Sequence, residues 1–348
     1  MTSIARETPC NPLPSHILNV NKNWMYHPNK KYEIGTEFFM LSFLDPFQIL
    51  HSGDIKGYIQ ELKENKSKDQ SNIYFILRKP KICLIPESFQ TKGTLVSMNF
   101  EVCDKQDKLI LSSQINLPKM RGEIKIESEF PFTKFKLVDS YGNSISSRPT
   151  SIIGNSNQDI GKFQYLLDYE VLYIGKSYGT DGNRNSLDRL VKHETFQEIL
   201  TDSMNDHPDK EVFVLIGNFS QKYFMVSLPY EQYPKNDNEE TQQHFFQNSG
   251  LNLSDSQLIS VTEGMLIKYF CPEYNEKFKE IFPSKSHVSY SKLYELNVRA
   301  LALELITGNK QTNFYTHKTG RLKKHFQNFE LTKSNGRFNI FEIDNYSS

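Results

Sequence analysis

Apolar and polar residues alternate along the first half of the chain in a pattern that predicts a series of β-strands. Two segments, 122–130 and 134–140, alternate with a period of two, as half-buried strands do. The short polar connection at 103–107 predicts a β-hairpin. Only residues 55–63 have a helical pattern, so we expect a β-rich unit, either a sandwich or a barrel-like fold. The continuous apolar runs are at 37–44, 72–78, 81–86, 94–102 and 108–117.

In the second half of the chain, segments with a strand pattern alternate with segments with a helical pattern. Residues 185–193 have a helical pattern. Thr195–Glu198 and Ser254–Gln257 each have the spacing of a capping box, which indicates the start of a helix, and Pro272 should end the second of these helices. The predicted strands are 170–175, 211–219, 222–228, 301–307 and 337–343, with the second and third expected to form a hairpin.

The strand pattern of the first half gives way to the mixed pattern of the second half at residues 140–161, a segment that is rich in Ser, Asn and Gly. Such a composition is typical of a connection between domains. We therefore expect two domains in a chain of 348 residues. Residues 1–150 would form a β-rich recognition or assembly domain, and residues 151–348 a compact α/β (α+β) domain.

The charge balance limits the ways in which this chain can bind other molecules. Lys and Arg together number 41, and Asp and Glu also number 41. The whole surface therefore offers no general attraction to nucleic acid, and any such binding must depend on local patches.

The spacing of the cysteines and the length of the apolar segments indicate the cellular compartment. The four cysteines are far apart and none forms a CxxC pair, so neither a disulfide framework nor a zinc site is expected. The first ten residues lack the apolar core of a signal peptide, and no stretch approaches the ~20 apolar residues of a membrane span. We expect a cytosolic protein without a membrane partner.

Three segments of the second half carry residues suited to chemistry. The first is Leu-Tyr-Ile-Gly-Lys-Ser at 172–177, the second is Arg189-Leu-Val-Lys-His193, and the third runs from Glu263 to Asn275 through a Cys-Pro-Glu-Tyr sequence. In this order they resemble the GIY-YIG nuclease family. In that family a Tyr-Ile-Gly strand leads to a helix with an Arg and a His, and a later helix bears a metal-binding Glu. The resemblance covers roughly residues 163–282.

The resemblance implies a metal-dependent hydrolysis of phosphodiester bonds. Glu263 would hold one divalent cation, Mg²⁺ or Mn²⁺, because hard cations prefer carboxylate oxygens. Arg189 would grip the phosphate with its planar fork, and His193 lies four residues later, on the same face of a helix. Tyr173 would orient or deprotonate the attacking water, and Asn275 would support the site by hydrogen bonding.

The family's first strand carries Gly-Ile-Tyr shortly before Tyr-Ile-Gly, and this sequence has no such tripeptide at that spacing. Tyr165 is the nearest tyrosine and is therefore the candidate for the first-strand role, with Tyr169 next.

A basic stretch at 309–337 is the expected nucleic-acid surface. Its lysines and arginines are interleaved with Phe314, Tyr315, Phe326 and Phe329. Phosphate neutralisation and base stacking are what such a mixture offers, although a solvated basic edge over a core would have the same composition. The expected contacts are Lys176, which follows the Tyr-Ile-Gly strand, and Lys318, Arg321, Lys323 and Lys324.

The sequence thus favours a metal-dependent endonuclease that acts on nucleic acid, with DNA favoured over RNA. A role in host defence or restriction would suit this domain pairing by analogy. The N-terminal domain would bind a protein partner or a second copy of the chain. Two alternatives stay open: a GIY-YIG-like module that binds nucleic acid or protein without cutting, and a structural protein whose motif matches are accidental.

Overall fold

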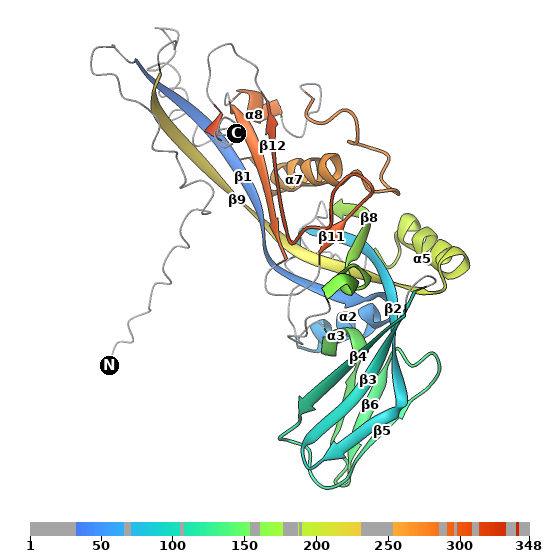
Figure 1. Ribbon diagram of the computed structural model, residues 1–348. Helices are drawn as coiled ribbons and strands as arrows, with labels where there is room; N and C mark the ends of the chain where they lie inside the picture. Colours follow the sequence, from blue (N-terminus) through green and yellow to red (C-terminus); the bar gives the residue numbers. More distant parts are fainter. Residues whose placement is uncertain are drawn as a thin grey trace, which may run out of the picture.

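The computed structural model describes residues 33–65, 71–104, 108–153, 161–176, 187, 190–230, 253–284, 291–295, 298–307, 313–331 and 339–340. The chain forms a mixed α/β structure in which a large, strongly curved β-sheet dominates and the helices are few (Figure 1). A smaller β-rich unit projects from one end of this sheet (Figure 1).

The main sheet combines strands from both halves of the sequence. Its order is β11-β8-β2-β9-β1-β10-β12. Most neighbours are antiparallel, but β1 pairs with β10 in parallel, and β11 pairs with β8 in parallel. The strands are β1 (Glu33–His51), β2 (Ile73–Lys92), β8 (Tyr169–Lys176), β9 (Lys210–Tyr230), β10 (Ala300–Ile306), β11 (Phe314–Tyr315) and β12 (Lys324–Glu330).

The strand β2 belongs to two structural units. Its first half, Ile73 to Pro80, pairs with β9, and Ile73 to Arg78 also pair with β8. Its second half, from Lys81, pairs with β3 (Leu95–Cys103), which in turn pairs with β4 (Lys108–Asn116). A second sheet of three strands, β5 (Ile124–Ser128), β6 (Phe135–Asp139) and β7 (Ser144–Ser147), completes the smaller unit.

The smaller unit is a two-layered β structure with its own core. Val96, Phe100 and Leu111 from one sheet form one buried cluster with Ile124 and Phe135 from the other. The rings of Phe100 and Phe135 stack with centroids 6.4 Å apart. The sequence therefore correctly predicts a β-rich, sandwich-like unit, and the predicted hairpin between β3 and β4 is confirmed.

Helices cover both faces of the main sheet. The α2 (Ile55–Glu64) and α5 (Glu194–Asp206) helices pack on one face with Tyr74, Ile76 and Val214. The α7 helix (Asp255–Phe270) packs on the other face with Phe75 and Leu215. The central strands are therefore buried on both sides, which is why their sequences are continuous apolar runs. The remaining helices are short: η1 (Ser52–Asp54), α3 (Pro149–Ile153), η2 (Gly161–Leu167) and α8 (Ser291–Glu295).

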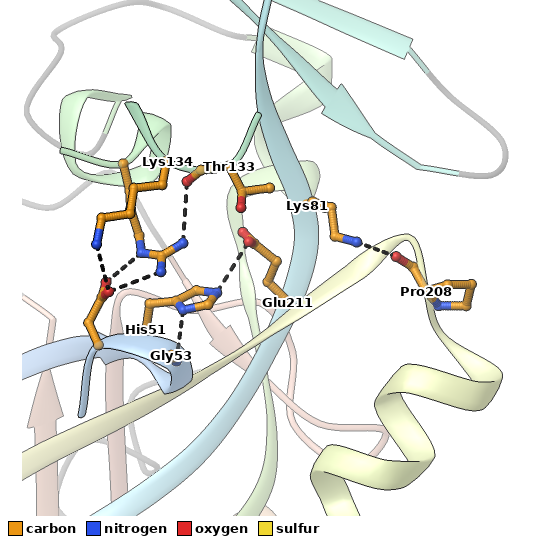
Figure 2. Close-up of polar contacts among 9 residues, drawn as sticks. His51, Gly53, Lys81, Thr133, Lys134, Pro208 and Glu211 are labelled. Carbon is orange, nitrogen blue, oxygen red and sulfur yellow. Dashed lines mark hydrogen bonds and ion pairs between the residues drawn. The ribbon is translucent and has the colours of Figure 1, made fainter. Parts of the chain in front are cut away.

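Polar contacts join the smaller unit to the main sheet (Figure 2). Arg148, just before α3, forms a two-pronged ion pair with Asp54 at the start of α2, and it also donates to the carbonyl of Thr133 at 3.3 Å. The Lys134 ammonium lies 3.8 Å from the same Asp54 carboxylate. On the adjoining strand, Lys81 donates to the carbonyl of Pro208. These contacts fix where the two units meet.

The strand pairing differs from the expected division at residue 150. The apolar runs 37–44 and 72–78 do not join the N-terminal unit alone, because β1 and the first half of β2 pair with β8, β9 and β10. A pattern of apolar residues predicts strands but does not specify which distant strand is the partner. Whether residues 1–150 and 151–348 fold separately stays a prediction.

Two local predictions were wrong. Residues 211–219 and 222–228 do not form a hairpin, because they belong to the single strand β9, which pairs with β1 along its length. Thr195 does not cap α5, because the helix begins at Glu194 with His193 as its N-cap. By contrast, the helix predicted at 55–63 and the capping box of Ser254 and Gln257 at the start of α7 are confirmed. The predicted strand 337–343 lies outside the described residues, apart from positions 339 and 340.

Candidate functional site

The outer edge of β8 is covered by α7 and by the residues that follow it. Beyond Glu170, β2 is the only strand that pairs with β8 among the residues described. From Leu172 to Lys176, every second residue of β8 is hydrogen-bonded to α7 or to the residues that follow this helix. The carbonyl of Leu172 accepts from the main-chain N–H of Tyr274 at 3.0 Å. The N–H of Lys176 donates to Glu263 Oε1 at 3.1 Å. These bonds satisfy the edge of the strand and hold Glu263 at its C-terminal end.

Asn275 makes two hydrogen bonds to a single residue of β8. Its Oδ1 accepts from the main-chain N–H of Ile174 at 2.9 Å, and its Nδ2 donates to the carbonyl of the same residue at 2.9 Å. The side chain is buried, with 6% of the residue exposed. Asn275 therefore acts like one residue of a neighbouring strand, and it aligns β8 with the chain that follows α7.

Glu263 faces the end of β8 from the third turn of α7. Its side chain is 13% exposed, and its Oε2 lies 3.8 Å from the ammonium of Lys176, which also contacts Ser260 Oγ at 2.9 Å. Ser260 and Glu263 are three residues apart and lie on one face of the helix. A main-chain N–H thus donates to one oxygen of the Glu263 carboxylate, and the partly exposed ammonium of Lys176 lies near the other oxygen.

Two tyrosines lie on paired strands beside this carboxylate. Tyr74 of β2 pairs directly with Gly175 of β8, and the rings of Tyr74 and Tyr173 stack with centroids 6.1 Å apart at an interplanar angle of 30°. Both tyrosines project toward the face that carries α5, whereas Glu263 comes from the helix on the opposite face and reaches around the edge. Tyr173 and Lys176 are three residues apart on β8, about 10 Å along a strand.

Tyr74 was not among the residues predicted from the sequence. It belongs to the tripeptide Asn72-Ile73-Tyr74, and the strand that carries it pairs antiparallel with the Tyr-Ile-Gly strand. The smaller β unit lies in the chain between these two strands, so the pair is far apart in sequence. The signal that could have found it is the Ile-Tyr pair at the start of a fully buried apolar run.

His193 lies near Tyr173 but not on the helix that was expected. It is the N-cap of α5, with extended backbone angles, and its ring centroid is 5.7 Å from that of Tyr173. Arg189 lies outside the described residues. The described residues on either side of it, Leu187 and Leu190, are buried in the cluster to which Tyr74 belongs.

Tyr274 connects the edge of β8 to α5. Its hydroxyl donates to Asp202 Oδ2 at 2.8 Å. Burial raises the pKa of Tyr274, and the Asp202 carboxylate raises it further, so this phenol stays protonated at physiological pH. The residues around Asn275 are therefore tied both to β8 and to the helix that begins at His193.

Tyr165 is not near Glu263. It lies in η2, before the first residue of β8, whereas Glu263 contacts the last residue of that strand. The two are separated by the length of an eight-residue strand, roughly 25 Å. Tyr165 packs against the core of the smaller unit, and its carbonyl accepts from Arg321 Nη1 at 3.2 Å. Tyr74, on the strand that pairs with β8, is the tyrosine whose ring stacks on that of Tyr173.

Two lysines of the expected nucleic-acid surface, Lys318 and Lys324, have local partners. Lys318 donates to the carbonyl of Lys268 at the end of α7 at 2.9 Å, and the Lys324 ammonium lies 3.6 Å from Glu304. Lys323 is exposed. Phe314 and Phe329 belong to the main hydrophobic core, so the stacking surface expected from them is absent. Nucleic-acid binding by this stretch stays a prediction.

The donors at this site can be tested for their fit to a divalent cation. Within the described part of the chain, no group of three or more His, Cys, Asp and Glu residues is arranged to hold a metal ion. Glu263 is the one carboxylate that the contacts above place at the strand end, where Lys176 contacts both Glu263 and the hydroxyl of Ser260. A set of one carboxylate and neutral oxygens suits Mg²⁺, which keeps several of its own waters.

Comparison of the chain with protein-family models, with curated proteins and with solved structures gave no match. None of the described helices is long and apolar enough to cross a membrane. Cys83 and Cys271 are free thiols.

Proposed function

We propose that this chain is a divalent-metal-dependent nuclease that hydrolyses phosphodiester bonds, with DNA favoured as substrate, and that its site is of the GIY-YIG type. One observation carries the proposal. Tyr74 and Tyr173 stack on paired antiparallel strands, and Glu263 is hydrogen-bonded to the end of the second of these strands. In this proposal the Asn72-Ile73-Tyr74 strand would take the role of the family's first strand, because it pairs antiparallel with the Tyr-Ile-Gly strand.

Each residue has a role that its position supports. A bound Mg²⁺ or Mn²⁺ supplies the charge that polarises the phosphate and stabilises the leaving oxygen. Glu263 would hold this cation in place of the Lys176 ammonium, because its other oxygen is already fixed by the N–H of Lys176. Tyr74 and Tyr173 would orient the attacking water and accept its proton, with His193 nearby as a second proton acceptor.

Three further residues complete the proposal. Lys176, released from Glu263, would neutralise the phosphate, and Arg189 would grip it with two hydrogen bonds. Asn275 would act as a positioning residue, because it aligns β8 without facing solvent. The smaller β unit would serve recognition of the substrate or assembly with a partner.

A second candidate function is binding of nucleic acid without cleavage. The ion pair between Lys176 and Glu263 favours it, because a carboxylate that is permanently neutralised by lysine does not need a metal. This module would bind nucleic acid with a steep salt dependence and leave the strands intact.

Cleavage of supercoiled plasmid with Mg²⁺ or Mn²⁺ tests the proposal. We expect Glu263→Gln to lose activity on the order of a thousandfold, because the cation loses its only charged ligand. Tyr74→Phe should lose about a hundredfold or more, because it removes one proton acceptor and keeps the ring. Glu273→Gln is the matched control, since Glu273 is an exposed glutamate on the segment after α7.

Two results would contradict the proposal. One is undiminished cleavage by Glu263→Gln in a preparation that unfolds at the same temperature as the wild type. The other is salt-sensitive binding of DNA by the wild type with no cleavage in either metal, which would establish the second candidate instead.

A further inference from the structure

A cavity lies where the main sheet meets the smaller β unit. Its volume is about 340 Å³, within the range of small-molecule sites. It is lined by residues from separate parts of the chain: Asp104 after β3, Tyr165 of η2, Asp209 and Lys210 at the start of β9, and Tyr315 and Arg321 around β11. Tyr165 precedes β8, so this cavity is at the end of that strand opposite to Glu263.

The cavity is lined by flat groups, and two of them, Arg321 and Tyr315, lie over each other. The Arg321 guanidinium carbon lies 3.6 Å from the centroid of the Tyr315 ring and 5.9 Å from that of Tyr165. Arg321 is held there because its Nη1 donates to the carbonyl of Tyr165 at 3.2 Å and lies 3.5 Å from the buried carboxylate of Asp168. Tyrosine rings and arginine planes are the surfaces on which nucleobases stack in proteins.

The polar lining contains both signs of charge. Lys210 and Arg321 are balanced by Asp104 and Asp209, and the lining also contains one histidine. A small inorganic anion or cation in such a cavity would lie close to a side chain of the same charge. A flat, neutral ligand with several donors and acceptors would instead find a partner for each edge.

We propose that this cavity binds a nucleobase together with its sugar. The base would stack on the planar surface of Tyr165, Tyr315 and Arg321, and the carboxylates of Asp104 and Asp209 would accept hydrogen bonds from exocyclic amino groups. Adenine, cytosine and guanine should therefore bind more tightly than uracil, which has no amino group. The base comes either from a free nucleotide or from an unstacked position in a single-stranded nucleic acid. The proposal does not depend on the nuclease function or on Glu263.

Isothermal titration calorimetry on the full chain, without metal, tests the proposal. The probes are adenosine, the four nucleoside monophosphates, ribose 5-phosphate and a short single-stranded oligonucleotide. We expect AMP and adenosine to bind within a few-fold of each other, and ribose 5-phosphate not to bind. Arg321→Gln and Tyr165→Leu should each weaken binding about tenfold or more, because each removes part of the stacking surface.

Matched variants separate this site from general charge and from the nuclease site. Lys92→Gln removes one positive charge from an exposed side chain that does not line the cavity, so it should change affinity less than twofold. Glu263→Gln should bind nucleotides as the wild type does, whatever its effect on cleavage. If Arg321→Gln proves unfolded by its thermal transition, Tyr165→Leu and Asp209→Asn, which keeps the volume of the side chain, decide the outcome.

The outcomes also distinguish the two sources of the base. Binding of mononucleotides that is lost in the cavity variants supports a free nucleotide as the ligand. Binding of the oligonucleotide alone, lost in the same variants, supports a base within a nucleic-acid strand. Failure of every probe to bind, or equal binding by the cavity variants and by Lys92→Gln, overturns the proposal.

Discussion

At the scale of single residues, Gly175 shows how tightly the candidate site is packed. A Cβ at this position would lie 2.5 Å from both Cζ and Oη of Tyr74 and 2.9 Å from Cε1 of Tyr173. Side chains do not approach each other so closely, and both rings would have to move. The glycine of Tyr-Ile-Gly is therefore what allows the two tyrosines to stack across paired strands.

We expect Gly175→Ala to destabilise the fold by about 1–3 kcal/mol, because the added methyl group overpacks a well-filled position. It should also reduce cleavage to the same extent as Tyr74→Phe or more, because the displaced ring carries the hydroxyl. Urea denaturation and the plasmid assay measure the two effects. Gly57→Ala is the control: nothing lies within 4 Å of its added Cβ, and the site is in α2, so that variant should be as stable as the wild type or more so.

Lys79 is a buried cation in the same strand as Tyr74. The residue is 4% exposed, and its ammonium lies 4.6 Å from the ring centroid of Tyr169 and 5.3 Å from that of Phe213. Burial lowers the pKa of Lys79 from 10.5 to about 8, although the carboxylates of Glu211 and Asp168 act to raise it. The folded protein therefore gives up this proton more easily than the unfolded chain does.

This difference predicts that the wild type becomes more stable, relative to Lys79→Met, as the pH rises. Between about pH 8 and pH 10.5 the unfolded chain keeps the lysine proton and the folded chain has lost it, so raising the pH favours folding. The gain over this range should be about 3 kcal/mol. Unfolding in urea at several pH values measures it. The exposed Lys323→Met should show no such dependence, and a flat difference for Lys79→Met would contradict the lowered pKa.

At the scale of elements, the sequence predicted most strands and the α7 helix, but not how they pair. The capping box of Ser254 and Gln257 was visible because its spacing is local. The break expected near Gln221 was wrong, because β1 pairs with β9 on both sides of that residue and the pairing outweighs the local polar sequence. The length of a long strand thus depends on the strands that pair with it as much as on its own residues.

The candidate site was predicted only in part for the same reason. Three of the predicted residues belong to motifs that are short in sequence. Tyr173 lies on β8, Glu263 contacts the end of this strand, and Asn275 contacts its edge. Proximity in sequence selects Tyr165 and not Tyr74, because Tyr165 lies shortly before Tyr173 in the chain. The true neighbour of Gly175 in the sheet is separated from it by the whole of the smaller β unit.

We expect Asn275→Ala to destabilise the protein by about 2–4 kcal/mol. The substitution removes two hydrogen bonds and leaves the buried N–H and C=O of Ile174 without their partner. Urea denaturation measures the loss, and hydrogen exchange at the Ile174 N–H should become faster. Glu276→Ala, at the exposed neighbouring position, should change stability by less than about 0.5 kcal/mol. Equal stability of Asn275→Ala and the wild type would remove Asn275 from its proposed positioning role.

At the scale of the whole molecule, the smaller β unit is fixed to the main sheet by a small number of charged contacts. Arg148 and Asp54 form the closest of these. Burial acts to raise the pKa of Asp54, but the hydrogen bond and charge of Arg148 outweigh it, so the pKa lies below its usual value. The junction is therefore sensitive to acid.

A double-mutant cycle of Asp54→Asn and Arg148→Met should give a coupling of about 1 kcal/mol at neutral pH, since the Asp54 side chain is 38% exposed. The coupling should be complete above the ordinary aspartate pKa of about 3.9 and disappear as the pH falls through the lowered pKa. Unfolding in urea at each pH measures it. The exposed pair of Lys125 and Glu123 should show almost no coupling at any pH.

The chain leaves the main sheet along β2 and comes back along β8, and the two points lie side by side. Arg78 pairs with Glu170 across these strands, and their side chains form an ion pair at 2.9 Å. A module whose two ends meet in this way can be exchanged for a tight turn, or for another module, without disturbing the surrounding architecture. The smaller β unit could therefore be replaced as a whole while the paired tyrosines keep their positions in the main sheet.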